Sequence, residues 1–492
     1  CRIFKLERNY RSTQNIVNAA NSLIHKNTKQ IPKTVYSEKE EGSKVSICSS
    51  YSDYEEGYAV AGKINDMRMQ NYDYADFAIL YRTNAQSRIL EEALRKRGIP
   101  YKIYGGLSFY QRKEVKDVIS YLRLIVNPHD EEAFKRVINY PARGIGDTTL
   151  NKLVVAATDH NVSLWTVLND PIGYALPVNN GTAKKLSDFR ELISGFIERN
   201  VKLSAEEIAA AVVKESGIVS TLFQDRSVEG ISKQENLQEL LKGIAEFCEI
   251  RREEGTEHVS LADFLSEVSL LTDQDNDKEE QANKVTMMTV HAAKGLEFRN
   301  VFVVGLEEDL FPSAMSKDNP RAVEEERRLF YVAITRAEEN CVLTHARSRY
   351  RNGQSTMCSP SRFLKDIDPK YIYTSADAVT TDGLLATRRS SVFQQPKAME
   401  GEAYVSPVAQ AVGRQARLTR METASLSSAP SSSSAPALSG LHVGAKVRHD
   451  RFGEGEVTAI EGEGGNAKAT VSFAHFGQKQ LLLKFARLTI VE

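Results

Sequence analysis

The sequence lacks several features that would assign it at once to a familiar class of protein. No stretch approaches the roughly 18 apolar residues that a membrane span needs, and the first residues have neither the apolar core nor the cleavage site of a signal peptide. The 5 cysteines lie far apart without a Cys-x-x-Cys pair, so neither a disulfide framework nor a thiolate zinc site is supported. These absences predict a cytoplasmic protein with reduced cysteines.

An excess of charge of one sign is also missing. The chain has 64 Lys and Arg against 65 Asp and Glu, which gives a net charge of −1. Binding to nucleic acid would therefore have to come from local patches. The length of 492 residues and the 41% hydrophobic content are typical of a globular chain with about three domains.

No segment matches the Gly-x-x-x-x-Gly-Lys-Thr loop that cradles nucleotide phosphates. Three other segments nevertheless have the composition of part of an ATP site. They are Glu7 to Ser12, Thr289 to Phe298, and Glu324 to Glu339. The function must therefore be inferred from one wall of a site.

Apolar patterns divide the chain into five parts. Strand and helix patterns alternate over residues 1–104 and 284–373, which predicts an α/β fold with one shared parallel sheet. Helical patterns dominate 105–283, an inserted domain. Residues 374–440 lose apolar periodicity and become rich in Ser, Ala and Pro, which predicts a flexible linker. Short strands with glycine turns over 441–492 predict a small β-barrel.

Two arginines are candidates for phosphate contacts. Arg336 follows a helix with an inward apolar face, and its planar guanidinium matches the oxygens of a phosphoryl group. Arg11 precedes a helix cap whose amides add positive potential, and Tyr10 beside it offers a ring for stacking on a base. The alternatives are a surface ion pair of Arg336 with Glu338 or Glu339, and a packed tyrosine beside a solvated arginine.

Polar side chains follow two predicted strands. Thr289 and His291 lie where a buried strand ends, the place where open α/β sheets bind ligands, and their donors suit a nucleic-acid phosphate. Arg82 and Asn84 repeat the arrangement and are candidates to hold a DNA strand. Glu297 follows a glycine turn and is a candidate acceptor for ribose hydroxyls. A capping threonine, a satisfied loop histidine and a solvated loop are the structural alternatives.

The inserted part contains one candidate anion site, the segment from Arg143 to Thr148. Gly144 and Gly146 stand just before a helix start, where exposed amides bind anions. We interpret the segment as a hairpin that grips a duplex phosphate without selecting sequence. An ordinary glycine turn with a capping residue is the alternative.

Together these motifs resemble the second half of a superfamily 1 DNA helicase of the UvrD, PcrA and Rep type. The resemblance covers about residues 1 to 365 without a break. The segments that carry it are Asn9 to Thr13, Tyr81 to Arg88, Tyr104 to Gly106, His291 to Phe298 and Glu324 to Glu339.

The resemblance implies an ATP-dependent motor that moves 3′ to 5′ on single-stranded DNA and separates duplex, in repair and replication. Residues 1–104 and 284–373 would form the RecA-like domain 2A, and 105–283 the inserted domain 2B. Tyr10 would stack on adenine, Glu297 would hold the ribose, and Arg11 and Arg336 would act as catalytic contacts to the γ-phosphate of ATP bound with Mg²⁺.

The same resemblance places Arg82, Asn84, Thr289 and His291 toward single-stranded DNA, and the Arg143–Thr148 hairpin with Gly144 and Gly146 toward the duplex at a junction. The C-terminal part is similar to the Tudor-like barrel of the UvrD and PcrA branch. That barrel implies contact with RNA polymerase or repair proteins, in the bacterial cytoplasm at the nucleoid.

The chain departs from the family in one respect. The family's first domain carries the glycine loop and an Asp-Glu box for phosphate and Mg²⁺, and neither motif occurs here. We therefore expect a C-terminal portion that supplies arginines to a site it cannot complete, and that is inactive alone. A motor-less adaptor that binds DNA or RNA polymerase is the alternative hypothesis.

Overall fold

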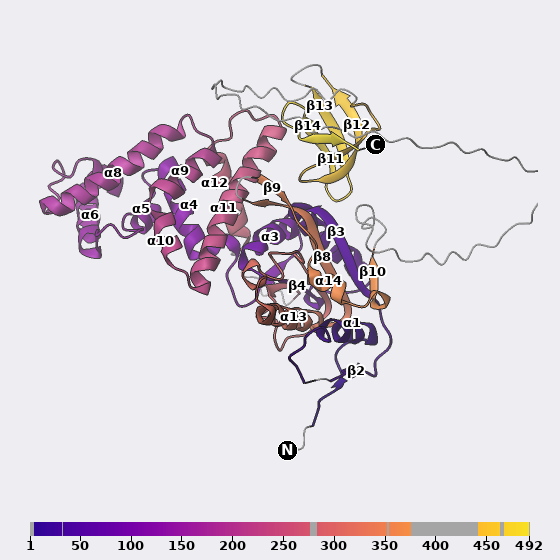
Figure 1. The fold of residues 1–492 in the computed structure, drawn as a ribbon. Coiled ribbons are helices and arrows are strands. Elements are labelled where there is room, and N and C mark those ends of the chain that lie inside the picture. The colour runs from indigo at the N-terminus through magenta and orange to yellow at the C-terminus, as the bar shows by residue number, and fades with distance from the viewer. Residues whose placement is uncertain are drawn as a thin grey trace, which may run out of the picture. The chain divides into compact units, whose positions relative to one another are not determined.

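The computed structural model confirms the predicted fold class, with a parallel sheet, many helices and a separate antiparallel C-terminal sheet (Figure 1). It describes residues 4–31, 33–275, 283–351, 354–374, 441–462 and 467–491. The predicted linker lies outside the described residues, except for residue 374.

One sheet joins the two α/β segments of the sequence. Its strand order is β10-β3-β8-β7-β4-β6-β5 with every neighbouring pair parallel, and β9 adds an antiparallel pair to β8. The strands are β3 (Val45–Ser52), β4 (Phe77–Tyr81), β5 (Tyr101–Ile103), β6 (Val285–Thr289), β7 (Phe298–Val303), β8 (Ala337–Arg351), β9 (Gln354–Met357) and β10 (Ile372–Thr374). A further short parallel pair joins β1 (Arg8–Asn9) to β2 (Tyr36–Ser37).

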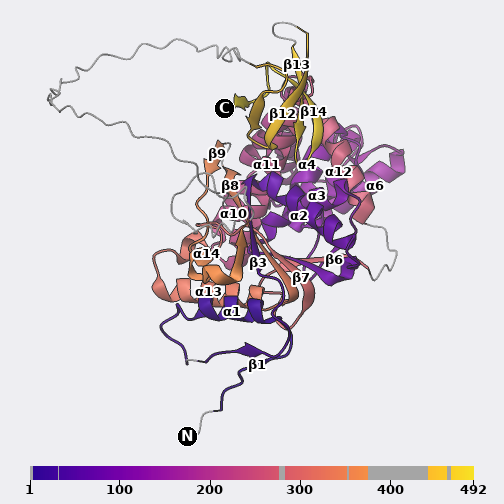
Figure 2. The ribbon, with the colours of Figure 1, turned by 90° about the vertical axis from the view of Figure 1, so that its right-hand side faces the viewer.

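Helices cover both faces of this sheet, which explains why β4 is apolar and buried along its whole length. Figure 2 shows α1 and α13 on one side of the sheet and α2 and α3 on the other. Alternate residues of β4 therefore enter different cores, and Ala78 and Leu80 pack with Phe330 of α13. The helices are α1 (Gln14–Ile24), α2 (Asp53–Arg68), α3 (Ser87–Lys96), α13 (Pro320–Ile334) and α14 (Arg362–Asp366).

The inserted segment between β5 and β6 is helical and has its own core. Its helices are α4 (Lys113–Val126), α5 (Glu131–Val137), α6 (Asp147–His160), α7 (Leu164–Asn169), α8 (Asn180–Asn200), α9 (Ala205–Glu215), α10 (Ile218–Gln224), α11 (Val228–Glu253) and α12 (Leu261–Asp275). Because β5 and β6 are parallel neighbours, the insertion occupies the position of a crossover connection.

The C-terminal part forms a five-stranded antiparallel sheet in the order β14-β13-β12-β11-β15. Its inward side chains alternate along β13, where Ala469, Val471 and Phe473 are buried. The strands are β11 (Lys446–His449), β12 (Gly453–Glu461), β13 (Lys468–Phe473), β14 (Gly477–Leu482) and β15 (Leu488–Ile490).

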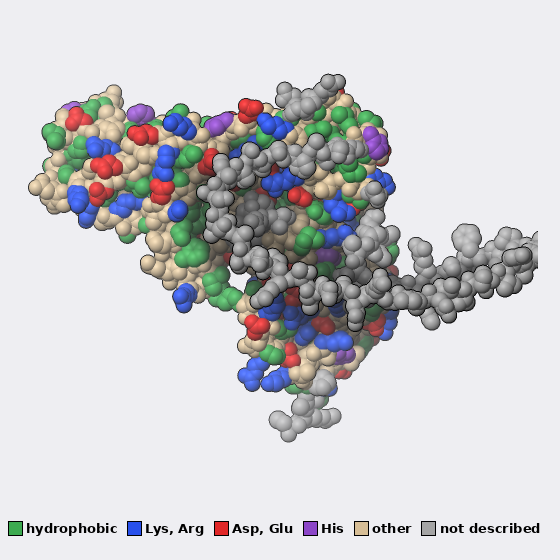
Figure 3. All heavy atoms as spheres, turned by 45° about the horizontal axis from the view of Figure 1, so that its top comes forward, with side chains coloured by type: hydrophobic (Ala, Val, Ile, Leu, Met, Phe, Trp, Pro, Cys, Tyr) green, Lys and Arg blue, Asp and Glu red, His purple; other side chains and the backbone are tan. Residues whose placement is uncertain are grey.

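The surface shows no dominance of one charge. Blue and red side chains are interspersed on the face drawn in Figure 3, in agreement with the net charge of −1. Over the described ranges, none of the helices combines the length and the apolar character needed to cross a membrane.

Candidate functional site

The predicted site residues divide between two opposite edges of the parallel sheet. We name them the amino edge, where strands β7 and β8 begin, and the carboxyl edge, where β4 and β6 end. Glu297 and Arg336 immediately precede β7 and β8, whereas Arg82 and His291 follow β4 and β6. The proposed nucleotide residues and the proposed single-strand residues are thus separated by the height of the sheet.

At the amino edge, the segment that contains Arg11 is hydrogen-bonded to the start of β8. The hydroxyl of Ser12 donates to the carbonyl of Ala337 at 2.6 Å, and the amide of Thr13 donates to the carbonyl of Glu338 at 3.0 Å. Both Ser12 and Thr13 are buried. Arg11 is thereby placed beside Arg336, although 325 positions separate the two hydrogen-bonded residues Ser12 and Ala337.

Arg11 and Arg336 meet at Thr335. The guanidinium of Arg11 donates to the Glu297 carboxylate at 2.7 Å and to the Thr335 carbonyl at 3.1 Å. The guanidinium of Arg336 donates to the Thr335 hydroxyl at 3.2 Å and to the carbonyl of Leu296 at 3.1 Å. One buried threonine therefore orients both arginines.

The charges at this edge suit an anionic ligand. Partial burial, together with the neighbouring charge of Arg11, lowers the pKa of Arg336, which still leaves an arginine protonated. The hydrogen bond and the charge of Arg11 lower the pKa of Glu297, whose side chain is 57% exposed. The two arginines and the one exposed carboxylate give a net positive charge, which the oxygens of a phosphate can neutralise.

Tyr10 is available for stacking. Its side chain is exposed, at 71%, and the guanidinium of Arg8 lies 4.6 Å from the ring centroid. An exposed aromatic ring beside a pair of arginines is suited to stacking on a nucleotide base.

At the carboxyl edge, Arg82 is tied to a residue that the motif analysis did not single out. Its Nε and Nη2 atoms donate to the two oxygens of Glu326, with contacts of 3.0 and 2.7 Å. Glu326 is buried on α13. The signal in the sequence is its spacing, because Glu326 stands three residues after Val323 and four before Phe330, on the apolar face of the helix.

The other carboxyl-edge residues lie near Arg82. Thr289 pairs in register with Tyr81, and its hydroxyl accepts from the amide of Ala292 at 3.3 Å. Partial desolvation and the charge of Arg82 lower the pKa of His291, so its imidazole is neutral at pH 7. The side chain of Asn84 is exposed.

The hydrogen bonds of Arg143 run to its own segment, and its contact with duplex DNA stays a prediction. Its guanidinium donates to the carbonyls of Val137 at 3.0 Å, Tyr140 at 2.8 Å and Ser216 at 3.1 Å, and to the hydroxyl of Tyr121 at 2.6 Å. These acceptors belong to the inserted segment itself, so the side chain helps to hold the loop together.

Three other residues of this loop are exposed, whereas Ile145 between the two glycines is buried. Gly144, Gly146 and Thr148 are exposed. Gly144 has a φ of +71°, a conformation that favours glycine, and Gly146 caps the start of α6. The exposed glycines leave the backbone of this loop accessible to an anion.

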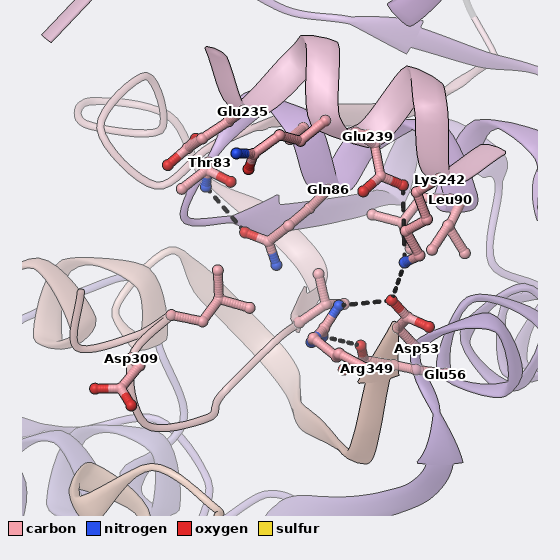
Figure 4. A pocket seen from close by; sticks show the side chains of 15 residues that line it. Asp53, Glu56, Thr83, Gln86, Leu90, Glu235, Glu239, Lys242, Asp309 and Arg349 are labelled. Carbon is pink, nitrogen blue, oxygen red and sulfur yellow. Dashed lines mark hydrogen bonds and ion pairs between the residues drawn. The ribbon is translucent and has the colours of Figure 1, made fainter. Parts of the chain in front are cut away.

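A cavity of about 330 Å³ lies between α2, the end of β8 and α11 (Figure 4). Charged side chains line it, and they engage one another: Lys242 pairs with Asp53, while Arg349 pairs with Asp53 and, at 2.9 Å, with Glu56. Burial alone would lower the pKa of Lys242, but Asp53 and Glu239 outweigh it and raise the pKa. These pairs indicate a structural joint between the sheet and the inserted helices.

Comparison with known proteins identifies the family of the chain. The family model described as the UvrD-like helicase C-terminal domain matches residues 4–348, and that of the PcrA/UvrD tudor domain matches residues 443–489.

Curated relatives extend the similarity along almost the whole chain. The chain is 36% identical over 490 residues to the ATP-dependent DNA helicase PcrA of Staphylococcus epidermidis, covering 98% of this chain and 61% of that protein. It is 35% identical over 487 residues to DNA helicase II of Escherichia coli strain K12, covering 99% of this chain and 62% of that protein. The chain thus spans about three fifths of the length of these relatives. It belongs to the UvrD-like helicase C-terminal domain family and ends in a PcrA/UvrD tudor domain.

Proposed function

We propose that this chain is the C-terminal portion of an ATP-dependent DNA helicase that moves 3′ to 5′ on single-stranded DNA. The observation that carries the proposal is the meeting of Arg11 and Arg336 at Thr335, with a positive balance of charge. The relatives named above are ATP-dependent DNA helicases or DNA helicases, which supports the same assignment.

In this proposal the amino edge is one wall of the ATP site. Arg11 and Arg336 hold the γ-phosphate and stabilise the charge that develops on its oxygens during transfer. Tyr10 stacks on the adenine, and Glu297 accepts hydrogen bonds from the ribose. ATP bound with Mg²⁺ supplies the phosphoryl group, and the residues that hold the metal are expected on a partner RecA-like domain.

The carboxyl edge is the DNA side of the proposal. Arg82, Asn84, Thr289 and His291 contact the backbone of single-stranded DNA, with His291 acting as a neutral donor. The exposed backbone at Gly144 and Gly146, with the hydroxyl of Thr148, contacts duplex phosphates at a junction. These contacts are independent of base sequence, as a translocating motor requires.

The C-terminal tudor domain is the proposed site of protein contact. RNA polymerase and repair proteins are the partner classes that the family resemblance implies. In this proposal the complete protein works in the bacterial cytoplasm, at the nucleoid, in repair and replication. The motor-less adaptor remains the alternative, and DNA binding that ignores ATP in the full-length protein would favour it.

The test is Arg336→Ala in the full-length protein. We expect ATP hydrolysis to fall by about 10³-fold or more, because an arginine finger acts on charge that develops in the transition state. Nucleotide affinity, measured by equilibrium titration, should change little. Arg321→Ala, an exposed arginine at the start of α13, is the matched control. Unchanged hydrolysis in Arg336→Ala would refute the proposed function.

A further inference from the structure

The helix α13 connects the two edges of the sheet. Glu326 in the middle of α13 lies at the carboxyl edge, paired with Arg82, and the helix ends at Ile334, directly before Thr335 and Arg336 at the amino edge. The rise of an α-helix separates Glu326 from Ile334 by about 12 Å. One rigid element therefore touches both the proposed DNA arginine and the proposed phosphate arginine.

The pair of Arg82 with Glu326 leaves room for a further anion. Among the described residues, the side-chain contacts of Arg82 run through Nε and Nη2. A guanidinium has five N–H donors, so the Nη1 edge is suited to a phosphate while Glu326 keeps its own two contacts. Glu326 is 7% exposed, and a carboxylate this buried depends on its partner for stabilisation.

Two residues of α13 form hydrogen bonds with the loop that follows α1. Arg327 donates to the side chain of Asn27 at 2.6 Å, and Glu324 accepts from the amide of Thr28 at 2.8 Å. Asn27 and Thr28 lie in the loop that ends α1, and α1 begins just after Arg11. Both phosphate arginines are thus attached to the α1 and α13 pair.

We propose that Glu326 is a positioning residue that couples DNA binding to ATP hydrolysis. A DNA phosphate on the free edge of Arg82 shares the charge that Glu326 otherwise holds alone. The changed attraction between Arg82 and Glu326 shifts the position of α13. Because Thr335 directly follows α13 and contacts both Arg11 and Arg336, this shift moves the two arginines. This inference rests on the proposed function and adds to it a residue that contacts neither ligand.

The test is Glu326→Gln in the full-length protein, with hydrolysis measured with and without saturating single-stranded DNA. The amide keeps the shape of the side chain and removes its charge. We expect the ratio of the two rates to fall by about 5- to 100-fold, the range of a typical coupling between two sites. Glu325→Gln is the matched control, since Glu325 is the neighbouring residue with a side chain 73% exposed. Its ratio should stay at the wild-type value.

The outcomes separate this inference from the proposed function. An unchanged ratio in Glu326→Gln, or an equal loss with and without DNA, overturns the coupling role. A normal rate in Arg336→Ala overturns the proposed function instead. If Glu326→Gln melts below the assay temperature, Glu326→Asp provides the ratio, because it keeps the charge but shortens the reach to Arg82. A wild-type ratio there overturns the coupling role as well.

Discussion

Arg11 and Arg143 are both singled out by motif, yet they have opposite surroundings. Arg11 lies at the amino edge of the sheet with a half-exposed carboxylate and one carbonyl as partners. Arg143 lies inside the inserted segment, where three backbone carbonyls and a tyrosine hydroxyl accept from it. The guanidinium of Arg11 has a side-chain carboxylate as its partner at an exposed edge, whereas that of Arg143 is held by backbone carbonyls of its own segment. We expect Arg11 to matter for function and Arg143 for stability.

Among the tests of this comparison, the largest effect should come from Arg11→Ala in the full-length protein. Loss of one preorganised donor to a developing charge lowers kcat by about 10²- to 10³-fold. Its ion pair with Glu297 is exposed on one side, so the free energy of unfolding should change by less than about 1 kcal/mol. Steady-state ATPase kinetics and urea unfolding measure the two quantities. A large loss of stability with normal kcat would show that Arg11 matters for stability and not for function.

Arg143→Met should give the opposite pattern. The substitution leaves the carbonyls of Val137, Tyr140 and Ser216 without their donor, which costs about 2–4 kcal/mol of unfolding free energy. The affinity of the folded protein for tailed duplex DNA should be nearly unchanged, as measured by fluorescence anisotropy. Lys184→Met, on the exposed start of α8, is the control for loss of one positive charge. A stable variant that no longer binds duplex would restore Arg143 as a DNA contact.

The smallest expected effect concerns the pH dependence of stability that a buried histidine, His345, produces. Burial lowers the pKa of His345, which is 8% exposed, so the folded state keeps its imidazole neutral. The unfolded chain takes up that proton below about pH 6.5. The unfolding free energy therefore decreases as pH falls through this value toward the lower folded pKa. Urea unfolding between pH 7.5 and 5.5 should show a flatter slope in His345→Asn. An unchanged slope would contradict this assignment.

The convergence of Arg11, Glu297 and Arg336 follows from features that the sequence shows. Each residue directly precedes a strand or lies close to a helix cap, and a parallel sheet brings strand starts together. The family resemblance supplied the pairing of these distant segments. The positions of these three residues could therefore be predicted from the local sequence pattern, from the alignment of strand starts in a parallel sheet and from the resemblance.

Other parts of the site could not be predicted from local pattern. The pair of Arg82 with Glu326 joins residues 244 positions apart, and the apolar flanks of Glu326 indicate a buried face without indicating a partner. The hydrogen bonds of Arg143 depend on the directions of the loop carbonyl groups. These directions cannot be predicted from the types of side chain in the sequence. Which residues become neighbours along each edge required the strand order, in which β6 lies between β4 and β5.

The position of the inserted helices also bears on modular design. The chain leaves the sheet at the end of β5 and returns at the start of the adjacent parallel strand β6. Ordinary proteins make the same journey with a single helix of about a dozen residues. The insertion is nevertheless no exchangeable part, because buried Arg88 and Asp53 of the sheet domain pair with Glu246 and Lys242 of α11, and a short bridge from Ile103 to Val285 would leave Arg88 and Asp53 without these partners.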